Sequence, residues 1–217
     1  LTGQNEKLPA LTTSSKCVPD SAHQPAFAYI PYLLTGDFYY LEELNFWNNW
    51  NLYIENPGYR MAEKGWVHRG ELRAQAWAMR TMAEAAAFNP DDYVGKAASI
   101  HYLNSNLGLY NSAYTDAKDY SNNAHNDLGA ITNGYALGYD FDGGTRNGTA
   151  PWQDDHFTSA IGHASELGFT EAARLLKWKA KFQIGRMIAD GYCPNDAAVY
   201  CLRLRDNHDT PFYKTLA

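Results

Sequence analysis

A chain of 217 residues is long enough for one well-buried domain, and its net charge of −6, with a pI near 5.6, provides no overall attraction to nucleic acid or anionic membranes. The longest apolar stretch, Ala26 to Leu34, is far shorter than the roughly 20 residues of a membrane helix and contains a proline. We therefore expect a soluble protein without a nucleic-acid or membrane partner.

The cysteines, Cys17, Cys193 and Cys201, are too few and too irregularly spaced for a disulfide framework or a zinc site, although Cys193 and Cys201 could pair. The chain begins at Leu1 without a signal-like segment, so we expect a trimmed or excised product. Further domains of a longer parent chain are then expected partners. Its compartment is unknown from the sequence. A secreted or periplasmic location is favoured if the protein acts on carbohydrate.

Two stretches of the chain, residues 20–50 and 153–182, share one layout. When they are aligned on Gly36 and Gly168, apolar residues recur after each glycine with helical spacing. Glycine readily adopts the left-handed backbone that ends a helix. Each stretch therefore predicts a helix, a tight turn and a second helix.

Capping residues mark where the predicted second helices begin. Asp37 and Thr170 follow the two glycines and carry side-chain oxygens suited to capping. A third unit starts with the helix-forming run 68–88, after which Asn89-Pro90 predicts a second helix that continues to about Asn106. The chain thus contains three predicted α-hairpins.

The remaining segments differ in composition from the hairpins. Residues 107–151 are rich in Gly, Asn, Asp and Tyr and form a predicted long loop insertion, with a short helix near 128–137. We interpret 1–22 as an N-terminal arm, 23–206 as the hairpin domain and 207–217 as a C-terminal tail.

The predicted fold class is all-α, with antiparallel α-hairpins arranged as a full or partial α/α toroid. Little of the sequence shows the β-branched alternation of a sheet. Repeated helix pairs can stack into an open solenoid or close into a toroid. The unequal hairpins and the long insertion favour the toroid.

Histidines stand at the start of all three hairpins, at His23, His68 and His156, and the last two follow tryptophans, Trp66 and Trp152. If the first helices of the hairpins are parallel, these residues share one rim, where helix N-termini add partial positive charge. The alternative is that they are only polar residues at helix entrances.

Three arginines, Arg69, Arg73 and Arg80, share one face of the helix predicted over 68–88. Guanidinium groups bind carboxylates and sulfates with two parallel hydrogen bonds, so this face suits an acidic ligand. The alternative is a solvated helix face with Glu84 as a local partner.

Groups for proton transfer occur at helical spacing as well. His156 and His163 are seven residues apart and share a helix face, as do Tyr29 and Tyr32. Histidine and tyrosine can exchange protons with a sugar carbon or a glycosidic oxygen. No metal-ligand motif is present, so we expect neither a metal nor a cofactor.

The hairpins, their histidine-bearing starts and the 14% aromatic content over about 23–187 resemble the α/α-toroid (six-hairpin) carbohydrate-active domains of polysaccharide lyases, glycoside hydrolases and sugar epimerases. The fragment from Phe46 to Gly58 resembles the Asn-Trp-rich segment of chondroitin and hyaluronate lyases, but its spacing differs, so no catalytic asparagine is transferred. The stretch from His23 to Leu44 also resembles a segment of large uncharacterised bacterial proteins.

This resemblance implies a domain that acts on or binds an acidic polysaccharide, by β-elimination if it is a lyase. In a lyase, Arg69 and Arg73 would neutralise the uronate carboxylate, His68 or His156 would be the base and a tyrosine the acid. The substrate-binding candidates are His23, Gln24, Tyr29, Trp66, Arg69, Arg73 and Trp152.

Three other functions stay open. A glycoside hydrolase needs two facing carboxylates, for which Asp154 or Asp155 with Glu71 are the candidates. A sugar epimerase needs bases on both faces of the sugar, which the histidines permit. A non-catalytic helical scaffold or glycan-binding module needs none of these groups to react.

Overall fold

The computed structural model describes residues 20–24, 27–56, 58, 66–68, 70–116, 126–132, 147–193, 195 and 199–216. The described part is mostly helical, as the sequence predicts. Its elements are α1 (Tyr29–Thr35), α2 (Phe38–Ile54), α3 (Leu72–Phe88), α4 (Lys96–Tyr114), β1 (Gly148–Thr149), α5 (Pro151–Glu166), α6 (Thr170–Ile188) and β2 (Leu202–Arg203). Among these residues, no helix has the length and apolar character needed to cross a membrane.

The helix–turn–helix prediction is confirmed at both glycines. Gly36 and Gly168 have left-handed φ values of 68° and 95°. The Asp37 carboxylate accepts a hydrogen bond from the Tyr39 amide and caps α2. The predicted Thr170 cap is wrong, because Phe169 is the residue at the cap position and Thr170 already belongs to α6.

The second helix of the middle hairpin differs from its prediction at both ends. Asn89 does not start a helix, because it caps the end of α3. Its side-chain amide donates to the Ala85 carbonyl of α3 and to the Asn45 side chain of α2. Turns follow, and α4 begins at Lys96. It continues past the predicted end near Asn106 to Tyr114, since the last two turns contribute Tyr110 and Tyr114 to the core.

The predicted short helix near 128–137 is not formed in its described part, because residues 128–132 lie outside every helix. The rest of that prediction lies outside the described residues. Cys193 and Cys201 are not joined to each other, so the disulfide considered for them is not formed. Cys17 lies outside the described residues.

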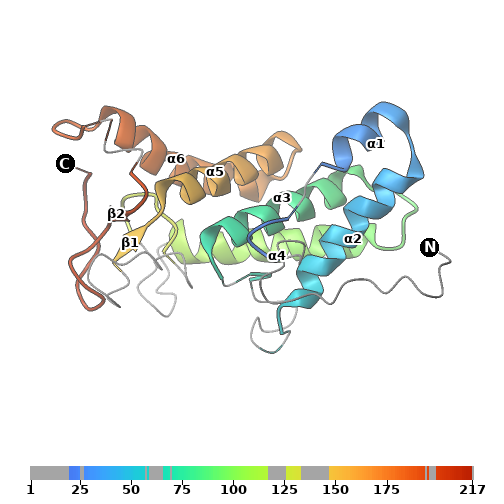
Figure 1. The fold of residues 1–217 in the computed structure, drawn as a ribbon, viewed down its shortest axis with the longest axis horizontal. Helices are drawn as coiled ribbons and strands as arrows, with labels where there is room; N and C mark the ends of the chain where they lie inside the picture. The colour runs from blue at the N-terminus through green and yellow to red at the C-terminus, as the bar shows by residue number, and fades with distance from the viewer. Residues whose placement is uncertain are drawn as a thin grey trace, which may run out of the picture.

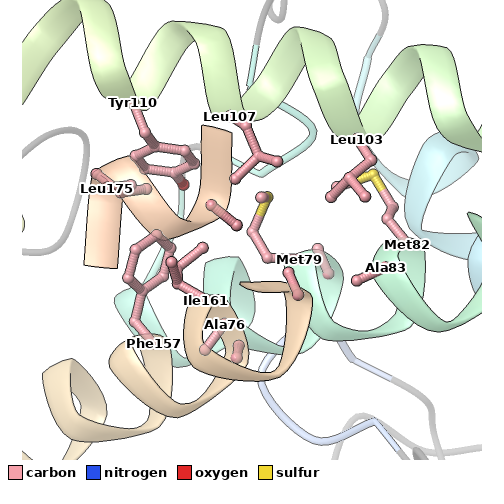
Figure 2. Close-up of a cluster of buried hydrophobic side chains, with 14 of the residues drawn as sticks. Ala76, Met79, Met82, Ala83, Leu103, Leu107, Tyr110, Phe157, Ile161 and Leu175 are labelled. Carbon is pink, nitrogen blue, oxygen red and sulfur yellow. The ribbon is translucent and has the colours of Figure 1, made fainter. Parts of the chain in front are cut away.

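Two hairpins build the centre of the molecule, with α3 beside α5 and α4 beside α6 (Figure 1). Their facing sides carry the main core, in which Met79, Leu107, Tyr110 and Phe157 are buried (Figure 2). The Tyr110 hydroxyl donates a 2.6 Å hydrogen bond to Gln75, which satisfies the polar end of this buried ring.

The tail of the chain packs back onto the domain. A small cluster of Leu128, Ala130, Phe182 and Leu204 is covered by Phe212 and Leu216. β1 pairs antiparallel with β2 beside it, and the Tyr213 amide donates to the Leu204 carbonyl. The described part of the predicted tail, 207–216, therefore belongs to the packed structure.

The first hairpin attaches to the rest through α2, which packs on α3. Part of this contact is polar. Asn45 and Asn89 exchange two amide hydrogen bonds of 2.7 and 2.9 Å, and Asn48 donates to the Ser99 hydroxyl. These side chains are buried, so each amide depends on its partner for hydrogen bonding.

We predict that Asn45→Ala destabilises the protein by about 1–3 kcal/mol, because the buried Asn89 amide loses its reciprocal partner. Urea unfolding monitored by circular dichroism measures this change. Asn49→Ala is the matched control, since Asn49 is exposed on the same helix. Equal stabilities of the two variants would show that the amide pair contributes nothing.

Candidate functional site

A pocket of about 450 Å³ lies among three helices of the described structure. Tyr29 of α1 and Arg80 of α3 line it together with a row of residues on α5. That row comprises His156, Ser159, Ala160, Gly162, His163 and Glu166. The shared face predicted for His156 and His163 is thus confirmed, and the face opens into a pocket.

Aromatic contacts fix the pocket's position relative to the core. The Tyr29 ring stacks on Phe88 with centroids 5.2 Å apart and planes 3° apart, and it lies 5.4 Å from the His163 ring. The His156 ring packs edge-on against Trp77 at 4.6 Å. Both histidines are therefore held by neighbouring rings.

The electrostatics of the pocket favour neutral imidazoles. Burial lowers the pKa of His156, and the Arg80 and Arg73 guanidiniums lower it further. Burial and Arg80 also lower the pKa of His163, against an opposing effect of Glu166. A neutral imidazole can accept a proton at neutral pH, which is the property a general base needs.

Behind these residues lies Glu84, which the sequence analysis considered only as a local partner of an arginine. Glu84 is fully buried, and its Oε1 accepts a 2.9 Å hydrogen bond from Arg80 and lies 3.6 Å from His163 Nε2. Glu84 Oε2 and His163 Nε2 are buried without a hydrogen-bond partner among the described residues. Burial raises the pKa of Glu84 to about 7, although Arg80 opposes the shift.

This raised pKa predicts a pH-dependent stability. The unfolded chain releases the Glu84 proton near pH 4.5, whereas the folded protein holds it to about pH 7. The folded state therefore binds more protons between these values, and its stability falls as pH rises through this window. The shift corresponds to about 3 kcal/mol.

We expect Glu84→Gln to remove this contribution. The measurement is urea unfolding of the wild type and the variant at pH 5 and pH 8, because the difference between the two proteins cancels the titrating groups that do not contact Glu84. The wild type should lose stability relative to Glu84→Gln by about 2.5 kcal/mol from pH 5 to pH 8. A pH-independent difference would contradict the raised pKa.

A second group joins the starts of α3 and α5. The Arg73 guanidinium donates to both Glu71 carboxylate oxygens at 3.1–3.2 Å and lies 5.2 Å from the centre of the Trp152 ring. Gln153 also donates to Glu71. The structure therefore brings together three predicted site residues, and Trp152 remains 39% exposed.

His68 and Gln24 belong to a third, buried group. His68 Nε2 is 3.0 Å from Asn51 Oδ1, Nδ1 is 3.4 Å from Glu55, and the Asn51 amide donates to Gln24. The His68 side chain is 0% exposed. A base must contact its substrate, so this enclosure favours His156 over His68 as the catalytic candidate.

The other predicted residues have separate surroundings. His23 is exposed and binds Asp20 at 2.8 Å, and Trp66 packs near Tyr110. Arg69 lies outside the described residues. The three histidines predicted to share a rim thus have three different sets of neighbours, and His156 lies inside α5 rather than before it.

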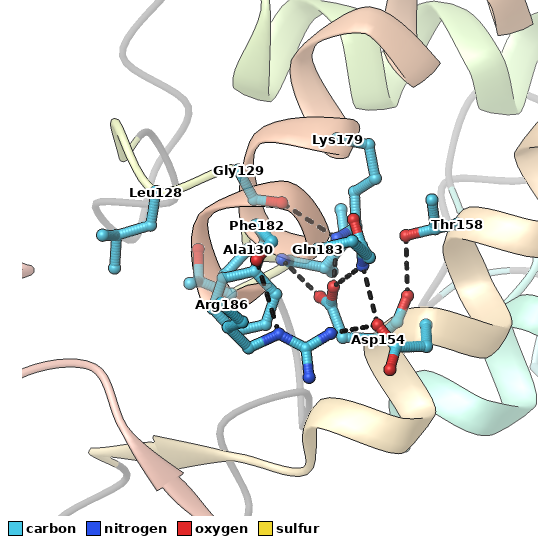
Figure 3. A network of polar contacts seen from close by, with 12 residues as sticks. Leu128, Gly129, Ala130, Asp154, Thr158, Lys179, Phe182, Gln183 and Arg186 are labelled. Atoms are coloured by element: carbon cyan, nitrogen blue, oxygen red, sulfur yellow. Dashed lines mark hydrogen bonds and ion pairs between the residues drawn. The ribbon is translucent and has the colours of Figure 1, made fainter. Parts of the chain in front are cut away.

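Asp154 and Asp155, the candidate carboxylates of a hydrolase, both form ion pairs with residues of α6. Figure 3 shows the contacts of Asp154. Asp154 is fully buried, forms an ion pair with Lys179 and accepts hydrogen bonds from Gln183 and the Ile131 amide. Asp155 pairs with Arg186. Asp154 therefore has a structural role, which the sequence pattern alone did not reveal.

No group of three or more histidine, cysteine, aspartate and glutamate side chains within the described ranges is arranged to hold a metal ion. No protein-family model, curated protein or solved structure matches the chain. The functional interpretation therefore depends on the geometry of the pocket itself.

Proposed function

We propose that the protein acts on or binds an acidic polysaccharide and that the pocket between α1, α3 and α5 receives one of its uronate units. The supporting observation is that Arg80, two histidines and Tyr29 line one cavity. A guanidinium suits a carboxylate, and neutral imidazoles suit proton abstraction. A pocket of about 450 Å³ is within the size range of small-molecule sites.

The proposed reaction is β-elimination. Arg80 neutralises the uronate carboxylate, taking the role the sequence assigned to Arg69 and Arg73, and His156 takes the proton from the carbon beside that carboxylate. A carbon–carbon double bond forms as the glycosidic carbon–oxygen bond breaks. Tyr29 donates its proton to the departing oxygen, and solvent returns both groups to their starting protonation states.

Two buried polar atoms add a contact for the sugar in this proposal. Glu84 Oε2 and His163 Nε2 lack a hydrogen-bond partner in the described structure, although buried polar groups are normally hydrogen-bonded. In the proposed complex a sugar hydroxyl reaches this end of the pocket and bonds with them. This contact would orient the ring relative to His156.

The toroid remains part of the proposal. Adjacent hairpins of an α/α toroid place first helix beside first helix and second beside second, and α3–α5 with α4–α6 have this relation. The first hairpin packs instead through α2 on α3. We propose a partial toroid that comprises the second and third hairpins.

The test is incubation of the protein with alginate and with a glycosaminoglycan. New ultraviolet absorbance from the unsaturated uronate would support β-elimination. New reducing ends without absorbance would instead indicate hydrolysis, which the burial of Asp154 and the Arg73 and Gln153 contacts of Glu71 disfavour. A changed sugar configuration with neither signal would indicate epimerisation.

A second candidate function is a non-catalytic helical scaffold or glycan-binding module. The observation that favours it is the exposure of large apolar side chains on α1, α2 and α6, which is typical of surfaces that contact other proteins. Saturable polysaccharide binding without any product would support the binding module. If the protein neither binds nor converts any polysaccharide, the scaffold function is supported.

A further inference from the structure

The outer face of α2 carries large apolar side chains. Positions 38, 42, 46, 49 and 53 follow each other at helical spacing and are all exposed. Phe38, Phe46 and Tyr53 on this face are 65%, 56% and 83% exposed. The inner face carries three buried asparagines beside the buried Leu41 and Leu44, so polar and apolar residues are not separated between the two faces as in an ordinary amphipathic helix.

The outer face of α6 has the same spacing. Positions 173, 177, 181, 184 and 188 are exposed, with Lys177 and Lys181 followed by Ile184 and Ile188. The two isoleucines are 54% and 72% exposed. This face is therefore basic along its middle and apolar toward its C-terminal end.

The two faces have opposite charge. No lysine or arginine occurs between Lys16 and Arg60, and Glu42 is the second of the five exposed positions of the α2 face. In contrast, the α6 face carries the exposed Lys177 and Lys181 and no acidic residue. The α1–α2 hairpin and the C-terminal end of α6 lie toward opposite ends of the long axis (Figure 1).

We propose that copies of this chain associate head to tail, with the α6 face of one copy packed on the α2 face of the next. Proteins built from stacked helical hairpins need polar outer faces on the first and last hairpins to remain soluble. In this chain the outer faces of α2 and α6 are both partly apolar. The faces differ from one another, so each bound copy leaves one face of each kind available. Such a contact extends into a chain of copies, or closes if the rotation permits a ring.

Sedimentation of the full chain at rising protein concentration tests this proposal. We expect the average mass to increase with concentration and to decrease with added salt, since salt screens the exposed charges. A monomer at every concentration up to the millimolar range would overturn the proposal. The two faces would then contact a different protein or further hairpins of a longer chain.

Charge reversal identifies the two faces. Glu42→Lys with Asn49→Lys makes both faces basic, and Lys177→Glu with Lys181→Glu makes both acidic. We expect each double variant to associate at least about tenfold more weakly, because like charges then meet. An equimolar mixture of the two should associate again, because each variant then faces opposite charge.

Two further outcomes would overturn the arrangement. In the first, both double variants associate as strongly as the wild type. In the second, the equimolar mixture of the two double variants associates no more than either variant alone. Asp209→Lys is the control, since it reverses an exposed charge in the turn at 207–210, outside both faces, and should leave association unchanged. Circular dichroism of every variant verifies that its helices are retained.

Discussion

Lys179→Ala is expected to destabilise the protein by about 3–5 kcal/mol, because it leaves the buried Asp154 carboxylate without its cation. Lys179 is fully buried, and its ammonium also donates a 2.9 Å hydrogen bond to the Gly129 carbonyl. One side chain thus links α5, α6 and the loop at 126–132. The loss should be measured by urea unfolding.

The same helix provides the control for this prediction. Lys177 is exposed, and Lys177→Ala should change stability by less than about 0.5 kcal/mol. Lys179→Met combined with Asp154→Leu removes both charges and should recover much of the lost stability. If Lys179→Ala is no more destabilising than Lys177→Ala, the ion pair does not hold the loop and the helices together.

His156→Ala is expected to reduce turnover of an acidic polysaccharide by about 10²- to 10⁴-fold, the usual contribution of a general base. Its ring lines the pocket and has a lowered pKa, so it is neutral and able to accept a proton at neutral pH. Initial rates of ultraviolet absorbance increase measure this effect at saturating and at limiting substrate.

The control histidine is His208, which is exposed beside Asp209 and does not line the pocket. His208→Ala should retain the wild-type rate. His156→Ala also removes the contact with Trp77, so its unfolding curve must be recorded to separate catalysis from stability. Full activity in a folded His156→Ala protein would exclude His156 as the base.

Local signals allowed much of the helical structure to be predicted. Gly36 and Gly168 end helices because a left-handed residue is needed at each turn, and Asp37 caps α2 by its own side chain. These features depend on neighbouring residues alone. Asn89 shows where prediction from neighbouring residues fails. Asn89 does not cap a following helix, because its side chain forms hydrogen bonds with Asn45, which is 44 positions away in the chain.

The site was less accessible to sequence reasoning. The spacing of His156 and His163 indicated a common face, and the structure places Tyr29 and Arg80 around it. The sequence could not distinguish these histidines from the buried His68, because burial depends on how α2 packs. Glu84 had one usable signal, its four-residue spacing from Arg80, but its burial arises only from the packed hairpins.

The most direct test of the central claim is an NMR titration of the histidine-labelled protein with a uronate oligosaccharide. If the pocket receives the acidic sugar, the imidazole signals of His156 and His163 will shift together and saturate, while those of the exposed His101 and His208 stay unchanged. Saturable binding that leaves the His156 and His163 signals in place, or no binding of any uronate oligosaccharide, would contradict the claim.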